Sequence, residues 1–289
     1  MSASSLAPYL RLVAFRHSIF ALPFALQGAW LASGGIPSAR TLLFIGVCAV
    51  SARTAAMAFN RLADARLDAL NPRTAARELP AGRLSRSSVA GLVALSSAVF
   101  VAGAFALNPL CGQLSFAVLA VLLGYSFTKR FTWLSHAVLG LALGLAPLGA
   151  WLAVRGDFEG DLAVPLLLAA AVLAWVAGFD LIYACQDRAF DVRHRLHSVP
   201  ARFGIAKALR ASRALHVITI VLLALLWSRA GLSWIYLLSI GVAAALLLWE
   251  HRLVSPDDLS RVDMAFFTLN GWVGVLLFVG LALDLGVGG

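Results

Sequence analysis

Long apolar stretches separated by short polar breaks follow one another along the whole chain. A helix of about 20 apolar residues is long enough to cross the hydrocarbon core of a bilayer. Very short breaks, such as Asn108-Pro109 and Ala230-Gly231, are typical of hairpins between antiparallel helices. The pattern predicts an all-α, multi-pass membrane protein with about nine transmembrane helices, near residues 18–33, 41–59, 87–107, 110–127, 133–153, 163–184, 214–229, 232–249 and 264–283.

Composition narrows the class of protein further. Apolar residues make up 61% of the 289 positions and charged residues 13%, against about half and about a quarter in an ordinary soluble domain. These values exclude a solvated globular protein, a disordered chain and a coiled coil. Nine crossings of about 20 residues each leave no room for a large soluble domain. We therefore expect one membrane domain that spans residues 1–289.

The basic residues are distributed unevenly between the two predicted faces of the membrane. With the N-terminus in the cytoplasm, 19 of the 23 Lys and Arg residues fall on the inner side, most of them in two long loops near 60–86 and 185–213. The outer side has only Arg40, Arg155 and Arg229. This bias predicts that both long loops face the cytoplasm. It also explains the formal charge of +9 without a nucleic-acid partner.

Both long loops begin with polar and acidic side chains at helical spacing. Residues four positions apart stack along one face of a helix, so each set would form a polar stripe at the end of a membrane helix. Two such sets continue predicted spans: Asn60, Asp64 and Asp68 after the second span, and Tyr183, Asp187 and Asp191 after the sixth.

Carboxylates one helical turn apart require a nearby cation, because like charges at this spacing cost an isolated helix about 0.2–0.5 kcal/mol. A salt-bridge network with neighbouring arginines is one interpretation. Bound Mg²⁺ is the other, since this hard cation prefers carboxylate oxygens and is commonly completed by phosphate oxygens. Basic side chains suited to the remaining oxygens of a diphosphate are Arg73, Arg77, Lys129, Arg130 and Arg202.

Three sequence blocks carry a resemblance to a known family. The first extends from Asn60 through Asp68 to an Arg-Thr-x-x-Arg-x-Leu-Pro-x-Gly segment at 73–82. The others are Tyr-Ala-x-x-Asp-x-x-x-Asp at 183–191 and Tyr-x-x-x-Lys-Arg-x-Thr at 125–132. Together, over nearly the whole chain, they resemble the intramembrane aromatic prenyltransferases of quinone biosynthesis, typified by 4-hydroxybenzoate polyprenyltransferase. Arg61 departs from the family pattern, which often has Asp at that position.

The resemblance implies an enzyme whose helices surround a central cavity and which uses Mg²⁺ to transfer a polyprenyl chain from polyprenyl diphosphate to an aromatic acid. The acceptors it implies are of the 4-hydroxybenzoate or 1,4-dihydroxy-6-naphthoate type, in ubiquinone or menaquinone biosynthesis. It also implies an integral protein of the bacterial inner membrane, with the bilayer and the two substrates as partners and no obligate protein partner. The implied metal ligands are Asn60, Asp64, Asp68, Asp187 and Asp191, the last two also catalytic, and the implied diphosphate ligands are Arg73, Arg77, Lys129, Arg130, Tyr183 and Arg202.

Arg53 is a charged residue inside a predicted span, and such a residue marks a functional hypothesis. It lies seven residues before Asn60, two turns deeper on roughly the same helical face. We expect Arg53 to bind the carboxylate of the aromatic acid, and we count it among the catalytic residues. Structural pairing with Asp180 or with helix carbonyls is the alternative.

A membrane transporter is the competing class of protein. Arg53, Asp180 and the two acidic helix ends could mark an ion path, and the weak repetition of the acidic motif resembles the internal repeats of transporters. However, the acidic residues fall at predicted helix ends and not at the middle of the membrane. This placement favours the enzyme.

Overall fold

The protein is described by a computed structural model that covers residues 8, 9, 11–13 and 21–287. Helices dominate, and no strand occurs within these described residues. The α-helices are α2 (Leu22–Ser33), α3 (Ala39–Leu70), α4 (Arg86–Leu107), α5 (Pro109–Gly124), α6 (Ser135–Arg155), α7 (Ala163–Ala184), α8 (Arg188–Arg193), α9 (Val199–Phe203), α10 (Ile205–Arg229), α11 (Trp234–Leu253) and α12 (Asn270–Val287). Two 3₁₀ segments, η2 (Tyr125–Arg130) and η3 (Cys185–Asp187), and one π-helical segment, η4 (Met264–Leu269), extend them.

Eight helical segments of the described chain are long and apolar enough to cross a membrane. They match the predicted spans from 41–59 onward, as expected for an all-α, multi-pass membrane protein. The predicted first span corresponds to the shorter α2, whose predicted start at residues 18–20 lies outside the described residues. Two helices extend well beyond their predicted spans: α3 ends at Leu70, eleven residues after the predicted end, and α10 begins at Ile205, nine residues before the predicted start.

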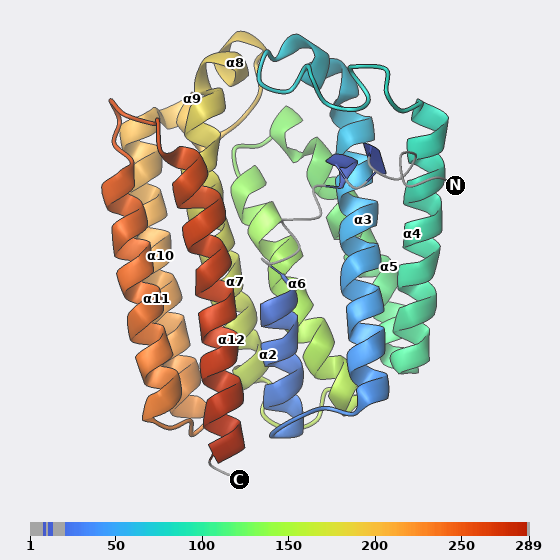
Figure 1. Ribbon diagram of the computed structural model, residues 1–289, viewed down its shortest axis with the longest axis vertical. Helices are drawn as coiled ribbons and strands as arrows, with labels where there is room; N and C mark the ends of the chain where they lie inside the picture. The colour runs from blue at the N-terminus through green and yellow to red at the C-terminus, as the bar shows by residue number, and fades with distance from the viewer. Residues whose placement is uncertain (1–7, 10, 14–20, 288–289) are drawn as a thin grey trace.

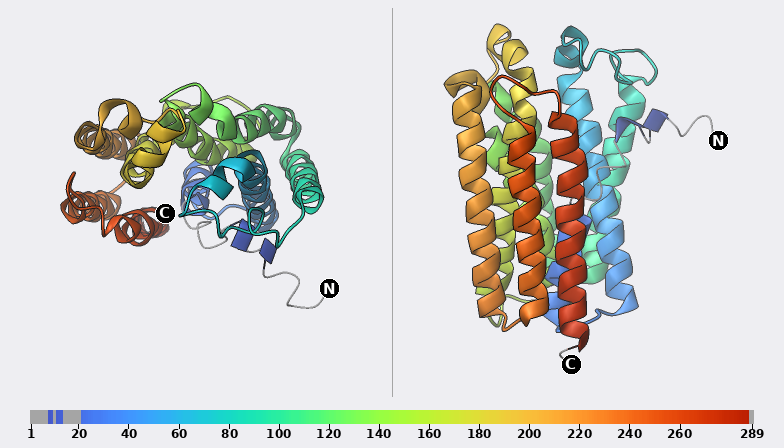
Figure 2. Two further views of the ribbon diagram at one scale, coloured as in Figure 1. Left: turned by 90° about the horizontal axis from the view of Figure 1, so that it is seen from above. Right: turned by 60° about the vertical axis from the view of Figure 1, so that its left-hand side comes forward.

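The long helices stand side by side and surround the interior of the molecule (Figure 1). Seen from above, they follow one another from α3 around to α12, and α2 lies on the inner side, where it contacts α6 and α12 (Figure 2). The loop at 71–85 and the short helices α8 and α9 lie at one end of the bundle (Figure 1). We call this the motif end, because the acidic ends of α3 and α7 meet there.

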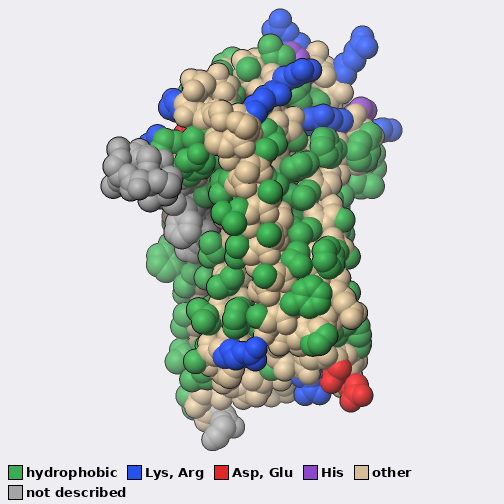
Figure 3. Space-filling model, turned by 90° about the vertical axis from the view of Figure 1, so that its right-hand side faces the viewer, with side chains coloured by type: hydrophobic (Ala, Val, Ile, Leu, Met, Phe, Trp, Pro, Cys, Tyr) green, Lys and Arg blue, Asp and Glu red, His purple; other side chains and the backbone are tan. Residues whose placement is uncertain are grey.

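The outer wall of the bundle is apolar between its two ends. Figure 3 shows hydrophobic side chains along the length of one side and a concentration of Lys and Arg at the motif end. Exposed residues such as Leu95, Phe116, Val217 and Leu248 contribute to this surface on different helices. A wide apolar band with charges confined to the ends is the surface that a bilayer requires.

Two glycines bring α6 close to α7. Gly140 and Gly144 face the backbone oxygens of Leu173 and Ala169, and a Cβ added at Gly144 would lie 2.7 Å from the Ala169 oxygen. Small residues allow transmembrane helices to approach closely and pack well. This contact helps to make α7 the most buried span of the protein, so the polar residues near the end of α7 stand on a rigid support.

Candidate active site

A cavity of about 730 Å³ opens among the helices at the motif end and continues toward the opposite end. Its deeper wall is apolar and includes Ile45, Leu107, Leu152 and Phe158. Its charged and hydrogen-bonding wall combines residues of α3, of the 71–85 loop, of η2 and of the α7–α8 region: Arg53, Asn60, Arg61, Asp64, Asp68, Asn71, Arg73, Thr74, Arg77, Lys129, Arg130, Asp180, Tyr183, Asp187 and Asp191.

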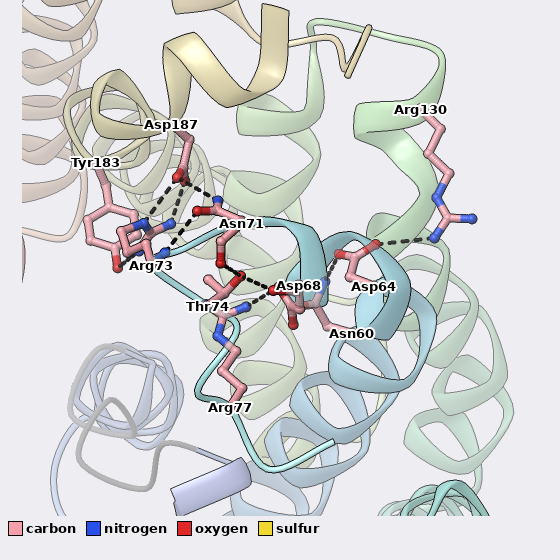
Figure 4. Close-up of polar contacts among 10 residues, drawn as sticks. All are labelled: Asn60, Asp64, Asp68, Asn71, Arg73, Thr74, Arg77, Arg130, Tyr183 and Asp187. Atoms are coloured by element: carbon pink, nitrogen blue, oxygen red, sulfur yellow. Dashed lines mark hydrogen bonds and ion pairs between the residues drawn. The ribbon is translucent and has the colours of Figure 1, made fainter. Parts of the chain in front are cut away.

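The end of α3 presents the first polar stripe to this cavity. Asn60 donates from Nδ2 to Asp64 Oδ2 at 3.2 Å, and the Asp64 Oδ1 atom is paired with Arg130 Nη2 at 3.2 Å. One turn later, Asp68 Oδ1 is 2.6 Å from Arg77 Nη1 (Figure 4). Asp68 is only 7% exposed, and its second oxygen, Oδ2, is buried without a hydrogen-bond partner in the described structure.

Arg73 connects the 71–85 loop to the second polar stripe. Its Nε and Nη2 atoms donate to the two oxygens of Asp187 at 3.0 and 2.5 Å, and its Nη1 atom donates to the Tyr183 hydroxyl at 2.7 Å (Figure 4). Asn71 Nδ2 also donates to Asp187, at 3.3 Å. Burial lowers the pKa of Arg73, but the hydrogen bonds and the charge of Asp187 outweigh burial, so this pKa is raised above its ordinary value.

Asp191, the last carboxylate of the second polar stripe, is held by the loop that follows it. The residue is 2% exposed, and its Oδ2 atom accepts a 2.7 Å hydrogen bond from the Ser198 hydroxyl. Ser198 also caps α9, since its Oγ atom accepts from the backbone N–H of Ala201 at 3.3 Å. One serine therefore fixes both the Asp191 carboxylate and the start of the next helix.

Arg202 is the predicted diphosphate ligand that the structure does not bring to the cavity. It is exposed on the five-residue helix α9, where its guanidinium lies over the Phe203 ring, 5.4 Å from the centroid. Arg202 follows Ser198, whose hydroxyl is bonded to Asp191, by four residues, yet it is not among the residues that line the cavity. The role of Arg202 as a diphosphate ligand stays a prediction.

The acidic residues fit a metal ion that is shared with a ligand. The described residues contain no group of three or more His, Cys, Asp or Glu side chains placed to hold a metal ion by themselves. Instead, Asp64, Asp68 and Asp187 are each paired with an arginine. Mg²⁺ is commonly bound by one or two carboxylates together with substrate phosphates. The unpartnered Asp68 Oδ2 atom fits such a set of oxygen ligands.

Comparison with known proteins identifies the family. The model of the UbiA prenyltransferase family matches residues 21–273. The chain belongs to this family. A curated relative, 4-hydroxybenzoate octaprenyltransferase of Aeromonas hydrophila, is 32% identical over 259 residues, which are 90% of this chain and 88% of the relative. The protein is thus a polyprenyltransferase by family, and the transporter interpretation is not supported.

Solved structures of UbiA homologues share the fold. The apo structure of a homologue from Aeropyrum pernix K1 is 37% identical, with a TM-score of 0.84, over 93% of this chain and 98% of that one. A homologue from Archaeoglobus fulgidus, solved with DMAPP and Mg²⁺, is 21% identical with a TM-score of 0.72, over 96% of this chain and 99% of that one. These similarities establish an integral membrane protein with the helix arrangement of the UbiA family.

Several polar residues of this UbiA site carry no signal in the sequence. Asn71 binds Asp187, Ser198 binds Asp191, and His136 binds Asp180 through a 2.6 Å contact between Nδ1 and Oδ2. Asp180 therefore pairs with a histidine of α6. No motif marks these partners, because each contact joins segments that are distant in sequence or follows from a local turn.

Arg61 and Arg53 occupy the cavity at different depths. Arg61, the departure from the family pattern, lines the cavity near Asp64 and Asp68 but makes no ion pair with a described carboxylate. Arg53 lines the cavity farther from the motif end, two helical turns before Asn60. The site therefore has Arg73 paired with Asp187, Arg61 near Asp64 and Asp68, and Arg53 farther from the motif end.

Proposed function

We propose that this protein transfers a polyprenyl group from polyprenyl diphosphate to the ring of an aromatic acid, in a Mg²⁺-dependent reaction. One observation carries the proposal: the acidic ends of α3 and α7, with their arginines, form the polar mouth of a deep apolar cavity. A diphosphate fits the mouth and an isoprenoid chain fits the depth. Family membership and the names of curated relatives point to the same reaction.

In this proposal the donor diphosphate is bound at the motif end. The metal ligands would be Asn60, Asp64, Asp68, Asp187 and Asp191, and bound Mg²⁺ would neutralise the charge that develops on the diphosphate as the allylic C–O bond breaks. The Archaeoglobus fulgidus homologue binds DMAPP with Mg²⁺, which supports this choice of metal. The residues proposed to bind the remaining phosphate oxygens are Arg73, Arg77, Lys129, Arg130 and Tyr183.

The arginine pairs prepare the site for an anion. Asp187 and Asp68 are ion-paired to Arg73 and Arg77 through contacts that a bound metal–diphosphate complex can replace, because each arginine gains phosphate oxygens as each carboxylate gains a metal. The fork of Arg73 is suited to a bidentate phosphate contact. Exchange of partners leaves no charge unpaired in either state, so binding avoids the cost of a buried single charge.

The acceptor is proposed to lie below the diphosphate. Arg53 stands seven residues before Asn60, which is about 10 Å farther along the helix, and is proposed to bind the carboxylate of the aromatic acid. Its planar guanidinium matches a carboxylate through two parallel hydrogen bonds. Acceptors of the 4-hydroxybenzoate type, or of the 1,4-dihydroxy-6-naphthoate type, would place an electron-rich ring between Arg53 and the allylic carbon. The product would enter ubiquinone or menaquinone biosynthesis.

We further propose that the whole chain acts as one domain in the bacterial inner membrane, with the motif end in the cytoplasm. The support is the concentration of Lys and Arg at that end, because basic residues favour the cytoplasmic side. Water-soluble aromatic acids and the headgroup of the donor would then reach the polar mouth from the cytoplasm, while the isoprenoid chain enters from the lipid. No obligate protein partner is required by this arrangement.

The test is direct. Membranes that contain the protein are incubated with Mg²⁺, a labelled polyprenyl diphosphate and a panel of aromatic acids that includes 4-hydroxybenzoate and dihydroxynaphthoates. We expect one prenylated aromatic product that disappears when EDTA removes the metal. Asp161→Asn, an acidic change at the opposite end of the bundle, is the matched control for Asp187→Asn. Absence of product from every acceptor, or full turnover by Asp187→Asn, would refute the proposal.

A further inference from the structure

His136 on α6 and Asp180 on α7 form a polar pair in the wall of the cavity. The His136 Nδ1 atom is 2.6 Å from Asp180 Oδ2. The two side chains differ in access, because His136 is 3% exposed whereas Asp180 is 15% exposed and lines the cavity. The histidine is therefore buried behind the carboxylate, and only the carboxylate can meet a ligand.

The hydrogen bonds of His136 define its role. Its Nε2 atom accepts from the backbone N–H of Val199 at 3.4 Å. An amide N–H can only donate, so Nε2 carries the lone pair and the ring proton of the neutral tautomer lies on Nδ1. Nδ1 then donates to Asp180 Oδ2. This leaves Asp180 as an acceptor whose second oxygen, Oδ1, has no hydrogen-bond partner in the described structure.

Asp180 also lies at a depth that the other acidic residues do not reach. It precedes Asp187 by seven residues, or about 10 Å along the helical path from α7 into η3, just as Arg53 precedes Asn60 on α3. Both deeper residues line the same cavity. Asp187 is already bound by Arg73, and Asp191 by Ser198. Asp180 is thus the carboxylate with an open oxygen below the diphosphate level.

We propose that Asp180 is the base that removes the proton from the aromatic ring and that His136 is the residue that positions it. The inference rests on the proposed aromatic prenyl transfer and names the proton acceptor for that reaction. The allylic C–O bond breaks and its electron pair leaves with the diphosphate. A ring carbon then forms the new C–C bond with two of its π electrons. The same carbon loses its proton to Asp180, and the C–H electrons restore the aromatic ring.

This assignment follows from what each residue offers. A general base must lie within hydrogen-bond reach of the proton that it removes, and Asp180 can present Oδ1 to a ring held between Arg53 and the donor. A hydrogen bond from His136 to Oδ2 fixes the rotamer of Asp180 in the way that a third group orients a catalytic base. Asp187 and Asp191 remain available for the donor.

The first test compares wild type with Asp180→Asn, using the acceptor that wild type prenylates and the same acceptor deuterated at the ring position that receives the prenyl group. General-base catalysis contributes about 10²–10⁴-fold, so we expect kcat to fall in that range. We also expect a primary deuterium isotope effect in the variant that wild type lacks, because loss of the ring proton becomes the slow step. The KM for the donor should stay within about twofold of wild type if Asp180 does not contact the diphosphate.

The second test separates positioning from simple packing at His136. His136→Asn retains an N–H donor near the position of Nδ1, whereas His136→Leu fills the space without a donor. Loss of a hydrogen bond to a charged group corresponds to about a tenfold or larger effect, so His136→Leu should lower kcat by about that factor and His136→Asn should restore most of it. The isotope effect should appear in His136→Leu and be smaller in His136→Asn.

The possible results separate the base assignment from the proposed prenyl transfer on which it rests. A wild-type protein that prenylates no aromatic acid would overturn the proposed function, and the base with it. With an active wild type, Asp180→Asn that keeps wild-type turnover, or loses turnover without an isotope effect, would overturn the base assignment alone. Loss of Mg²⁺-dependent binding of a non-hydrolysable prenyl thiodiphosphate by Asp180→Asn would also overturn it, by placing the residue in donor binding.

Discussion

Two polar clusters inside the helix bundle are built in opposite ways. The cavity cluster, formed by Asp64, Asp68 and Asp187 with their arginines, faces open space at the motif end. The core cluster is formed by Trp175, His216, Glu250, His251 and Asn270, none of which lines the cavity. The first consists of full charges that can exchange partners. The core cluster consists mainly of hydrogen bonds between buried side chains, which a ligand in the cavity does not reach.

The core cluster binds four helices to one another. Asn270 accepts from Trp175 Nε1 at 2.7 Å and donates to Glu250 Oε1 at 2.9 Å. His216 and His251 are in contact through Nδ1 and Nε2 at 2.9 Å. Glu250 and Asn270 are fully buried. Because these residues come from α7, α10, α11 and the start of α12, the cluster holds together the half of the bundle that supports α7.

The contrast indicates where chemistry and stability reside. Polar groups that are buried and hydrogen-bonded mainly to one another fix a structure, whereas polar groups that face a cavity and are paired with arginines at its mouth remain open to a ligand. Substitutions in the cavity cluster should therefore reduce activity more than stability. Substitutions in the core cluster should have the reverse effect.

Among variants that compare the two clusters, the largest effect is expected for Asp68→Asn. The change removes the carboxylate that has an unpartnered oxygen, and with it electrostatic stabilisation of the diphosphate. Loss of one such group commonly lowers kcat by about 10²–10³-fold. Prenyl transfer is measured in membranes together with the thermal stability of the purified protein. Near wild-type turnover would show that the cavity cluster is structural.

Arg73→Lys should have the next largest effect. Lysine retains the charge but cannot reproduce the contacts that Arg73 makes with Asp187 and Tyr183. Hydrogen bonds between charged groups contribute about 1.5–3 kcal/mol, so the KM for the donor should rise about tenfold or more. Initial rates at several donor concentrations give this value. A raised acceptor KM with an unchanged donor KM would contradict the assignment.

Asn270→Leu should separate the two clusters most clearly. It removes hydrogen bonds to Trp175 and Glu250, each of which contributes on the order of 1 kcal/mol between membrane helices. We expect a lower midpoint of thermal unfolding in detergent, with unchanged kcat for the folded fraction. If kcat instead falls as steeply as in Asp68→Asn, the core cluster takes part in the reaction, and the division of stability and activity between the two clusters is wrong.

The smallest effect is expected for Asp161→Asn, at the end of the bundle opposite the motifs. Asp161 Oδ2 pairs with Arg229 Nε at 2.7 Å, but both side chains are substantially exposed. Exposed ion pairs contribute about 0–1 kcal/mol. Stability and prenyl transfer should both match wild type within error. A large loss of activity here would mean that acidic substitutions impair the protein without regard to position.

The sequence allowed the helices and the two acidic stripes to be predicted because both depend on local periodicity. Apolar length determined the spans, and a spacing of four placed Asp64 and Asp68 on one face of a helix that does continue to Leu70. The meeting of the two stripes at one end followed from the charge bias of the loops. These features require no knowledge of which helices touch.

The partners of the acidic residues could not be predicted in the same way. His136 and Asp180 are 44 residues apart, and a single histidine in an apolar stretch carries no pattern that names its partner. The position of Arg202 depends on a tight turn and on the Ser198 cap. The π-helical segment η4 (Met264–Leu269) could not be predicted either, because its sequence resembles any apolar helix, although Asn270 Nδ2 donates to the Ala265 carbonyl within it at 3.0 Å.

The central claim is that the cavity cluster binds a metal–diphosphate complex, and its most direct test is a binding titration. A non-hydrolysable prenyl thiodiphosphate is titrated calorimetrically into the full-length protein in lipid nanodiscs, with Mg²⁺ or with EDTA. We predict Mg²⁺-dependent binding by wild type and by Asn270→Leu, and binding at least about tenfold weaker by Asp68→Asn. Equal affinity with and without Mg²⁺, or wild-type affinity in Asp68→Asn, would contradict the claim.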